Sequence, residues 1–159
     1  MTKVILGIDP GIADTGFGVI RAEKNCLTCL DYGTIKTSAK ASLSDRLEVL
    51  SCELTKIIKK YNPEAIAVEQ LFFCKNVKTA LTVGHARGII LLTAKQNNIE
   101  PIEFTPLQVK QAVSAYGKAS KLQVQKMVKL LLNLKELPKP DDAADALAIA
   151  ICASNSCNK

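Results

Sequence analysis

Four acidic residues in this chain stand where a protein rarely leaves a carboxylate unpartnered. Asp9 and Glu69 each end a short apolar stretch, KVILGID and AIAVEQ, that predicts a strand. Asp142 and Asp145 open an alanine-rich stretch, DDAADALAIAICA, that predicts a helix. An ionised carboxylate withdrawn from water must be paired or must bind a cation. We expect no Arg or Lys beside these four acids to do the pairing.

Carboxylates from distant parts of a chain suit Mg²⁺, a hard cation that takes oxygen ligands. Two Mg²⁺ ions about 4 Å apart would neutralise the four charges and hold the attacking and leaving oxygens of a phosphoryl transfer. Mn²⁺ is an alternative ion, and an activated water suffices as the nucleophile. Without cations, repulsion should raise the pKa of at least one carboxyl. The four acids therefore predict a metal-dependent enzyme that cuts phosphodiester bonds.

The acids of the last predicted helix also have a purely structural interpretation. Acidic residues in the first turn of a helix complement its dipole, so Asp142 and Asp145 could serve as capping residues alone. They are three residues apart and share one face of a helix. Asp141 suits the capping role better and would leave the other two free. The alanines that follow would let this helix lie close against a sheet, bringing its acids to Asp9 and Glu69.

Positive charge is concentrated in the middle of the chain. Residues 70–139 hold eleven basic and three acidic residues, a balance of +8, whereas the whole chain carries +6. Such a segment is expected to bind a polyanion, although a solvated lysine face without a partner has the same composition. The candidate contacts with nucleic acid are Lys75, Lys78, Lys110, Lys118 and Lys121.

The predicted loop LFFCKNVK carries two of the few aromatic residues in the chain. Phe72 or Phe73 could stack on an unpaired base, an interaction worth about 1–3 kcal/mol. The alternative is that both rings close the core beneath the loop. Because the two are adjacent, one ring could point inward and the other outward.

The overall composition of the chain is that of a globular protein. The chain has 159 residues, of which 48% are hydrophobic, so we expect one domain over 1–159. No apolar stretch approaches the roughly 20 residues of a spanning helix, and the N-terminus is unlike a signal peptide, so we expect a cytoplasmic protein without a membrane partner. In a cytoplasmic protein the six cysteines are expected to be free thiols and not disulfides. The single C-x-x-C, Cys26 and Cys29, is weak evidence for zinc, and the only histidine, His85, is expected at a surface or interface.

Apolar spacing and turn residues predict the elements that position the acids. Alternation places Asp9 on the same strand face as Gly7, and Glu69 on the face of Ala65 and Ala67. These small neighbours would leave room for ions and a phosphate. The order of elements predicts an α/β domain with a mixed sheet. We expect strands over 3–9, 15–23, 26–37, 65–70 and 99–104, and helices over 43–61 (with Ser44 and Asp45 as caps), 79–97, 106–116, 120–134 and 141–154.

Six segments in order resemble the RuvC family of Holliday-junction resolvases: ILGIDPGIADTGFGVI, AVEQLFFCKN, ALTVGHARG, QVKQAV, KLQVQKMV and DDAADALAIAI. Each is weak alone, but the ordered set, from Lys3 to about Cys152, is highly specific. The resemblance implies a ribonuclease-H-like α/β fold with a five-stranded mixed sheet flanked by helices. It also implies Mg²⁺-dependent paired nicking of four-way DNA junctions, in recombination and repair, and work with the branch-migration complex of RuvA and RuvB.

The resemblance further implies roles for single residues and a homodimer. It places an aromatic wedge at Phe72, DNA contacts at Lys110 and Lys121, and a loop before Lys121 in which Ala115 replaces a common glycine. The second predicted helix is our candidate dimer interface. There Gly84, Ala86 and Gly88 would permit close approach, and Ile89 and Leu92 would be buried against the partner. The implied catalytic and metal-binding carboxylates are Asp9, Glu69, Asp142 and Asp145.

Two other classes of protein share some of these features. Actin-like and sugar-kinase ATPases also begin with a strand, Asp, Gly, a turn and a strand, so GIDPGIADTGFGV alone does not exclude them. Such ATPases need two lobes, for which this chain is short. A non-catalytic DNA-binding module would account for the basic segment, but it would not account for Asp9 and Glu69 at strand ends.

Overall fold

A single mixed sheet organises the computed structural model, which describes residues 2–24, 26–70 and 77–156. Its strands lie in the order β3-β2-β1-β4-β5. The first three strands in the chain form an antiparallel meander, and β4 and β5 run parallel to β1. The strands are β1 (Thr2–Asp9), β2 (Asp14–Glu23), β3 (Cys26–Lys36), β4 (Ala65–Glu69) and β5 (Pro101–Phe104).

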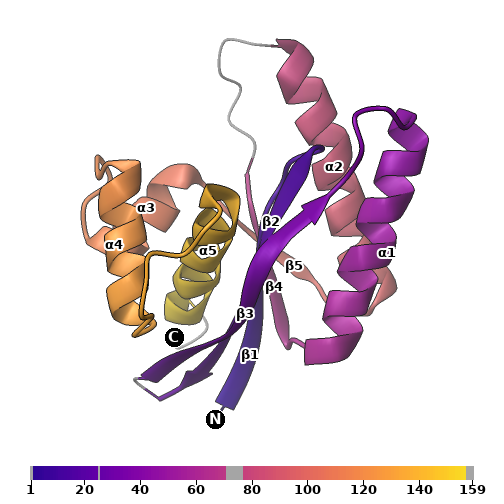
Figure 1. The fold of residues 1–159 in the computed structure, drawn as a ribbon. Helices are drawn as coiled ribbons and strands as arrows, with labels where there is room; N and C mark the ends of the chain where they lie inside the picture. The colour runs from indigo at the N-terminus through magenta and orange to yellow at the C-terminus, as the bar shows by residue number, and fades with distance from the viewer. Residues whose placement is uncertain (1, 25, 71–76, 157–159) are drawn as a thin grey trace.

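Helices cover both faces of this sheet, two on one side and three on the other (Figure 1). Every predicted strand and helix is present, with ends that differ from the predictions by a few residues. Among the described residues, no helix is both long and apolar enough to cross a bilayer. On one face lie α1 (Leu43–Tyr61) and α2 (Val77–Gln96), and on the other α3 (Pro106–Ser114), α4 (Lys121–Leu131) and α5 (Asp141–Ser156).

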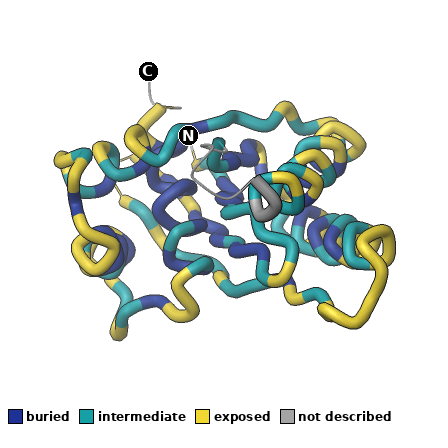
Figure 2. Tube along the Cα trace, turned by 90° about the horizontal axis from the view of Figure 1, so that it is seen from above, coloured by how far each residue is buried: buried dark blue, intermediate teal, exposed yellow. Residues whose placement is uncertain are grey.

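Two hydrophobic cores lie on opposite faces of the sheet, as the alternation along β1 predicts. Ile5 packs with residues of α3, α4 and α5, whereas Leu6 and Ile8 pack with residues of α1 and α2. In Figure 2 the buried segments lie inside the molecule and the exposed ones follow its outer helices and loops. The face that carries Ile5 is also the face of Asp9, so the α5 side of the sheet contains the candidate site.

Helix α5 lies in direct backbone contact with the sheet. A Cβ added at Gly7 would lie 2.2 Å from the carbonyl oxygen of Ala146, and one added at Gly16 would lie 2.0 Å from that of Asp142. The expectation that small residues leave room for ions and phosphate at this face is therefore wrong. The backbone of α5 occupies that space, because alanine and glycine allow the helix and the sheet to approach without side chains between them.

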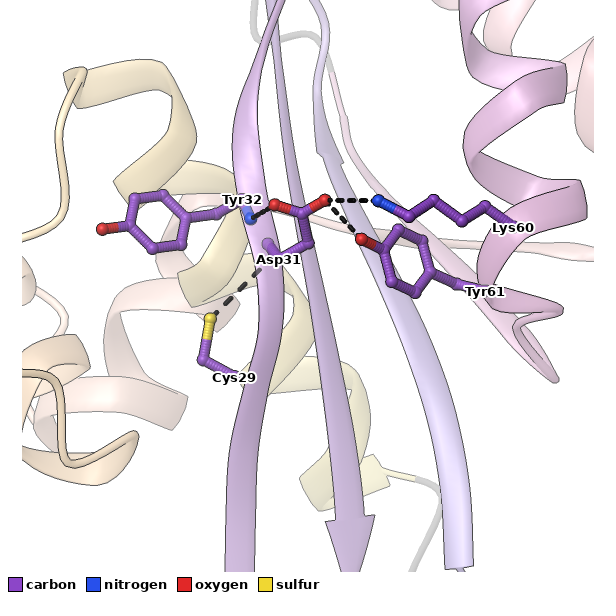
Figure 3. A network of polar contacts seen from close by, with 5 residues as sticks. All are labelled: Cys29, Asp31, Tyr32, Lys60 and Tyr61. Carbon is purple, nitrogen blue, oxygen red and sulfur yellow. Dashed lines mark hydrogen bonds and ion pairs between the residues drawn. The ribbon is translucent and has the colours of Figure 1, made fainter.

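The outer strand β3 is fixed to α1 by the carboxylate of Asp31 (Figure 3). It accepts hydrogen bonds from the hydroxyl of Tyr61 and from Lys60 Nζ, the latter at 3.4 Å. A register shift between β2 and β3 leaves Leu30 unpaired, so Leu30 packs on the α1 side while Cys29 packs on the α5 side. Cys29 is a packing thiol, and burial, ahead of the charge of Asp31, raises its pKa to about 11.

The helices that carry the candidate lysines have well-defined starts. α3 and α4 each begin with a capping box, formed by Thr105 with Gln108 and by Ser120 with the residue three positions on. α3 ends at Ala115, whose φ of 55° lies in the left-handed region that glycine adopts more easily. The start of α1 differs from prediction: Ser42 is the cap, because its hydroxyl accepts a hydrogen bond from the third residue of the helix.

Candidate active site

Three of the four predicted acids meet where the end of β1 faces the start of α5. One carboxylate oxygen each from Asp9, Asp142 and Asp145 lie within 4.8 Å of one another. β1 delivers Asp9 as its last residue, and α5 presents the other two acids on one face of its first turns. The close contact between α5 and the sheet at Gly16 therefore fixes the separation of these carboxylates.

Glu69 lies at the same edge of the sheet but outside the group of three. It ends β4, which runs parallel to β1 with Val68 opposite Ile8. The carboxyl ends of neighbouring parallel strands meet at one edge, so the negative charge of Glu69 acts on Asp9. Glu69 also faces a hollow of about 190 Å³ whose lining includes Asp145, Lys110 and Lys121. The fourth acid is thus placed beside the other three, with a space open to solvent between it and the lysines.

The electrostatics of the cluster match the expectation for carboxylates gathered without cations. The pKa of Asp9 is raised to about 8, chiefly by burial and in addition by the charges of Glu69, Asp145 and Asp142. Burial is also the largest cause of the raised pKa values of Glu69 and Asp145. Converging carboxylate oxygens that repel one another are suited to an oxygen-binding divalent cation. The residues present therefore fit the metal ions that the sequence implies.

The expectation that no basic side chain accompanies the acids is wrong in three dimensions. Lys121 Nζ lies 3.0 Å from Asp145 Oδ2 and 3.4 Å from Asp141 Oδ2. No basic residue is adjacent in the sequence, but the packing of α4 against α5 brings Lys121 to the cluster. Desolvation lowers the pKa of Lys121, but the hydrogen bond and charge of Asp145 outweigh it, so that pKa is raised overall. Lys121 remains a cation in this position.

Of the other residues predicted to contact nucleic acid, the structure places one beside the acids. Lys110 is half-buried and lines the hollow beside Glu69. Lys118 is exposed. Lys78 belongs to α2, but its side chain lies outside the description. Phe72, Phe73 and Lys75 also fall outside the described residues.

The candidate dimer helix α2 presents part of the predicted surface outward. Gly88 and Leu92 are exposed, and Leu92 retains 53% of its accessible area. Gly84 and Ile89 are partly buried, and Ile89 packs against the core on the α1 side. Ala86 is fully buried in that core, so its predicted place in the interface is wrong. His85 is exposed, as expected.

Sequence reasoning missed the role of Asp141 and that of Gln125. Asp141 does not cap α5, because it is the first residue of that helix and the carbonyl of Pro140 accepts the first amide hydrogen bonds. Its carboxylate instead accepts a hydrogen bond from Gln125 Nε2 at 2.9 Å and pairs with Lys121. The spacing of Lys121 and Gln125, one turn apart on α4, indicates a shared face. Their common partner on α5 is visible only in the folded chain.

Comparisons with known proteins give one consistent result. A family model described as "Crossover junction endodeoxyribonuclease RuvC" matches residues 5–153. A protein of that name from Ruminiclostridium cellulolyticum is 58% identical over 153 residues, which cover 96% of this chain and 92% of the relative. One from Halothermothrix orenii is 57% identical, with coverage of 96% and 93%.

Solved structures extend the comparison to the fold. The structure described as "T. thermophilus RuvC in complex with Holliday junction substrate" superposes with a TM-score of 0.92 at 36% identity, over 97% of this chain and 94% of that one. The yeast mitochondrial Holliday junction resolvase Ydc2 has a TM-score of 0.67 at 18% identity, over 94% and 77%, and shares the fold. These matches confirm the predicted ribonuclease-H-like α/β fold. They also confirm that the family is one of metal-dependent nucleases with a cluster of acidic residues. The chain belongs to the RuvC family of crossover junction endodeoxyribonucleases.

Proposed function

We propose that this chain resolves Holliday junctions at the acid cluster, by paired symmetric nicks made through Mg²⁺-dependent hydrolysis. The observation that carries the proposal is the convergence of the partly buried carboxylates of Asp9, Asp142 and Asp145, which lie within 4.8 Å of one another. Gathering carboxylates in this way costs folding free energy unless a cation compensates their charge. Membership of the family indicates the reaction, and the acid cluster is the proposed place where it occurs.

Each acid of the cluster has a proposed part in the reaction. Asp9, Glu69, Asp142 and Asp145 would hold two Mg²⁺ ions, or Mn²⁺ in their place. When bound, these ions activate a water and stabilise charge on the leaving oxygen. The chain itself orients the phosphodiester, because Lys110 and Lys121 line the hollow from which a phosphate would reach the acids. Lysine at this position binds phosphate as a point charge.

The segment after β4 is our candidate for holding the crossover open. Phe72 and Phe73 follow Glu69 by three and four residues in the sequence. Either Phe72 or Phe73 could then stack on a base that has left the helix next to the cut. Lys75, Lys78 and Lys118 are the more distant candidates for phosphate contacts in this proposal.

The proposal is tested with labelled four-way junctions and matched duplexes. We expect paired nicks near the crossover in Mg²⁺, no cleavage in EDTA and little cleavage in Ca²⁺, which coordinates with looser geometry. Duplex DNA should remain intact, and an ATP-hydrolysis assay should give no signal, as expected for a protein that is not an actin-like ATPase. Cleavage that persists in EDTA, or that is equal on duplex and junction, would contradict the proposal.

A homodimer follows from the symmetry of the substrate. A junction presents two equivalent strands, and the described residues of this chain form one acid cluster, so we expect the second cluster to come from a second copy. The outward face of α2 supports this assignment, since Leu81, His85, Gly88 and Leu92 are exposed at spacings of three and four residues. With Gly84 and Ile89 at its edge, this face is our proposed interface.

Leu92→Glu should separate the subunits, because it places a charge in the proposed interface. We expect sedimentation to show a monomer that still folds and that makes single nicks without paired cuts. Leu130→Glu is the matched control: Leu130 is a leucine of α4 with 71% of its area exposed. A Leu92→Glu protein that stays dimeric at working concentration would rule out this interface.

The remaining parts of the proposal concern the cellular setting. A resolvase acts after branch migration, so RuvA and RuvB are the proposed partners. Since the substrate is recombining DNA, we place the reaction in the bacterial cytoplasm.

A further inference from the structure

Lys121 bridges two carboxylates that have different roles. Asp145 belongs to the group that can hold a metal ion, whereas Asp141 lies outside that group. The side chain of Asp145 retains 32% of its accessible area and that of Asp141 retains 64%. The ammonium group of Lys121 therefore contacts one carboxylate inside the acid cluster and one more exposed carboxylate beside it.

Asp141 is held in place independently of Lys121. Its Oδ1 accepts a hydrogen bond from Nε2 of Gln125, a buried side chain on α4, while its Oδ2 faces Lys121. Both partners come from α4, and Asp141 itself begins α5. The carboxylate is thus fixed between two helices, with one oxygen available to a cation.

A metal ion bound at the carboxylate of Asp145 would compete with Lys121 for it. The ammonium already contacts this oxygen at 3.0 Å, and a divalent ion bound to it would repel the lysine. The Lys121 side chain is 52% exposed, so water can solvate its ammonium group as it moves away from Asp145. The lysine can leave Asp145 without leaving the site, because Asp141 remains within reach.

We propose that Asp141 is a positioning residue that holds Lys121 when a divalent ion displaces it from Asp145, so that Lys121 serves as an exchangeable counter-ion for the acid cluster. This inference rests on the proposed metal-dependent function. Without metal, Lys121 neutralises part of the cluster. With metal, Asp141 keeps the ammonium at the mouth of the hollow, beside Lys110, where a phosphate enters.

The test is the affinity for Ca²⁺ without DNA, measured by calorimetry at fixed pH and salt in wild type, Lys121→Met, Asp141→Asn and the double variant. We expect Lys121→Met to bind Ca²⁺ more tightly, by about tenfold, since the competing cation is gone. Asp141→Asn should bind about threefold more weakly, since Lys121 then stays on Asp145. In the Lys121→Met background, Asp141→Asn should have no effect. The amide oxygen of Asn can still accept the hydrogen bond from Gln125.

The double variant separates this inference from its rivals. If Asp141 attracted the metal ion only by its charge, its replacement would weaken binding equally with and without Lys121, and the inference would be wrong. Unchanged Ca²⁺ affinity in Lys121→Met would also overturn it, leaving Lys121 as a DNA contact alone. Glu136→Gln and Lys126→Met, which remove exposed charges outside the site, should leave the affinity unchanged.

A second measurement, of melting temperature, shows whether a substitution at Lys121 acts by destabilising the fold. In EDTA, Lys121→Met should melt at a lower temperature than wild type, because the acids lose a counter-ion, and saturating Ca²⁺ should remove that difference. A deficit that persists in Ca²⁺ would indicate a structural role for Lys121. If wild type binds Ca²⁺ but the variants do not differ, only the counter-ion exchange fails. If wild type binds no Ca²⁺ or Mn²⁺ at all, the proposed metal site fails with it.

Discussion

Asp9→Asn is expected to abolish junction cleavage, leave junction binding intact or tighter, and make the metal-free protein more stable. Cleavage should stop because Asp9 is one of the three acids whose oxygens converge, and the amide carries no charge for a cation. Binding should persist because the lysines provide the phosphate contacts, and one fewer negative charge repels the DNA less. Near-normal nicking by the purified variant would contradict the assignment of Asp9.

The stability part of this prediction has a definite pH dependence. The pKa of Asp9 is raised from 3.8 to about 8, so the folded protein binds a proton over a range in which the unfolded chain does not. This contribution is fully present below pH 3.8 and is lost as the pH rises through about 8. Metal-free wild type should therefore lose stability toward pH 9.

Urea unfolding in EDTA at pH 6 and pH 9 measures this effect. Asp9→Asn should exceed wild type at pH 9 by about 1–3 kcal/mol, and the difference should be smaller at pH 6. Asp14→Asn is the control, because the side chain of Asp14 forms an exposed ion pair with Lys36 at 4.0 Å in the described part of the chain and lies outside the acid cluster. It should shift the stability little at either pH. A variant at Asp9 that is less stable than wild type at pH 9 would show that the carboxylate is structural.

Gly16→Ala is expected to damage both the fold and the site. The added methyl carbon would lie 2.0 Å from the carbonyl oxygen of Asp142, which is backbone and cannot rotate away. Helix α5 or strand β2 must move, at a cost of about 3 kcal/mol or more. Since the same helix carries the acids, a shift of about 1 Å should lower cleavage on the order of 100-fold even where the protein remains folded.

Gly88→Ala provides the matched control for a glycine-to-alanine change. A Cβ at Gly88 meets no atom within 4 Å, and alanine is the better helix former by about 0.5–1 kcal/mol. Because Gly88 lies on the proposed dimer face, both changes are compared in the monomeric Leu92→Glu background, where we expect Gly88→Ala to unfold at a higher urea concentration than its parent and Gly16→Ala at a lower one. Equal stability of Gly16→Ala and wild type would show that α5 does not contact β2 as described.

Much of the fold could be predicted because local patterns determine its elements. The alternation along β1 gave the correct faces, and the three- and four-residue spacing from Leu43 to Tyr61 gave the correct helix. Asp9 and Glu69 could be selected because carboxylates at the ends of apolar strands are unusual. Asp142 and Asp145 could be selected because their spacing puts them on one helix face.

The errors arise where one element contacts another. The pairing of Lys121 with Asp145 joins α4 to α5, and no spacing within one segment reveals it. The small residues around Gly7 could have accommodated either a ligand or a helix backbone, and the sequence does not distinguish them. The amide groups of Ala143 and Ala144 donate to the carbonyl of Pro140, so the carboxylate of Asp141 was free to turn toward α4. Local rules assign a residue its element, but its partner depends on packing.

The position of α5 in the chain also affects when the enzyme can become active during its synthesis. The meander of β1, β2 and β3 can pair as soon as the first 36 residues have left the ribosome, since these strands are neighbours in sequence. The core on the α5 side and the acid cluster remain incomplete until residues 141–156 emerge and dock on the sheet. A nascent chain would therefore carry Asp9 and Glu69 without the other two acids. On the proposed assignment of the four acids, cutting activity would begin only when α5 is in place, so we expect partly made copies of the nuclease to leave DNA uncut.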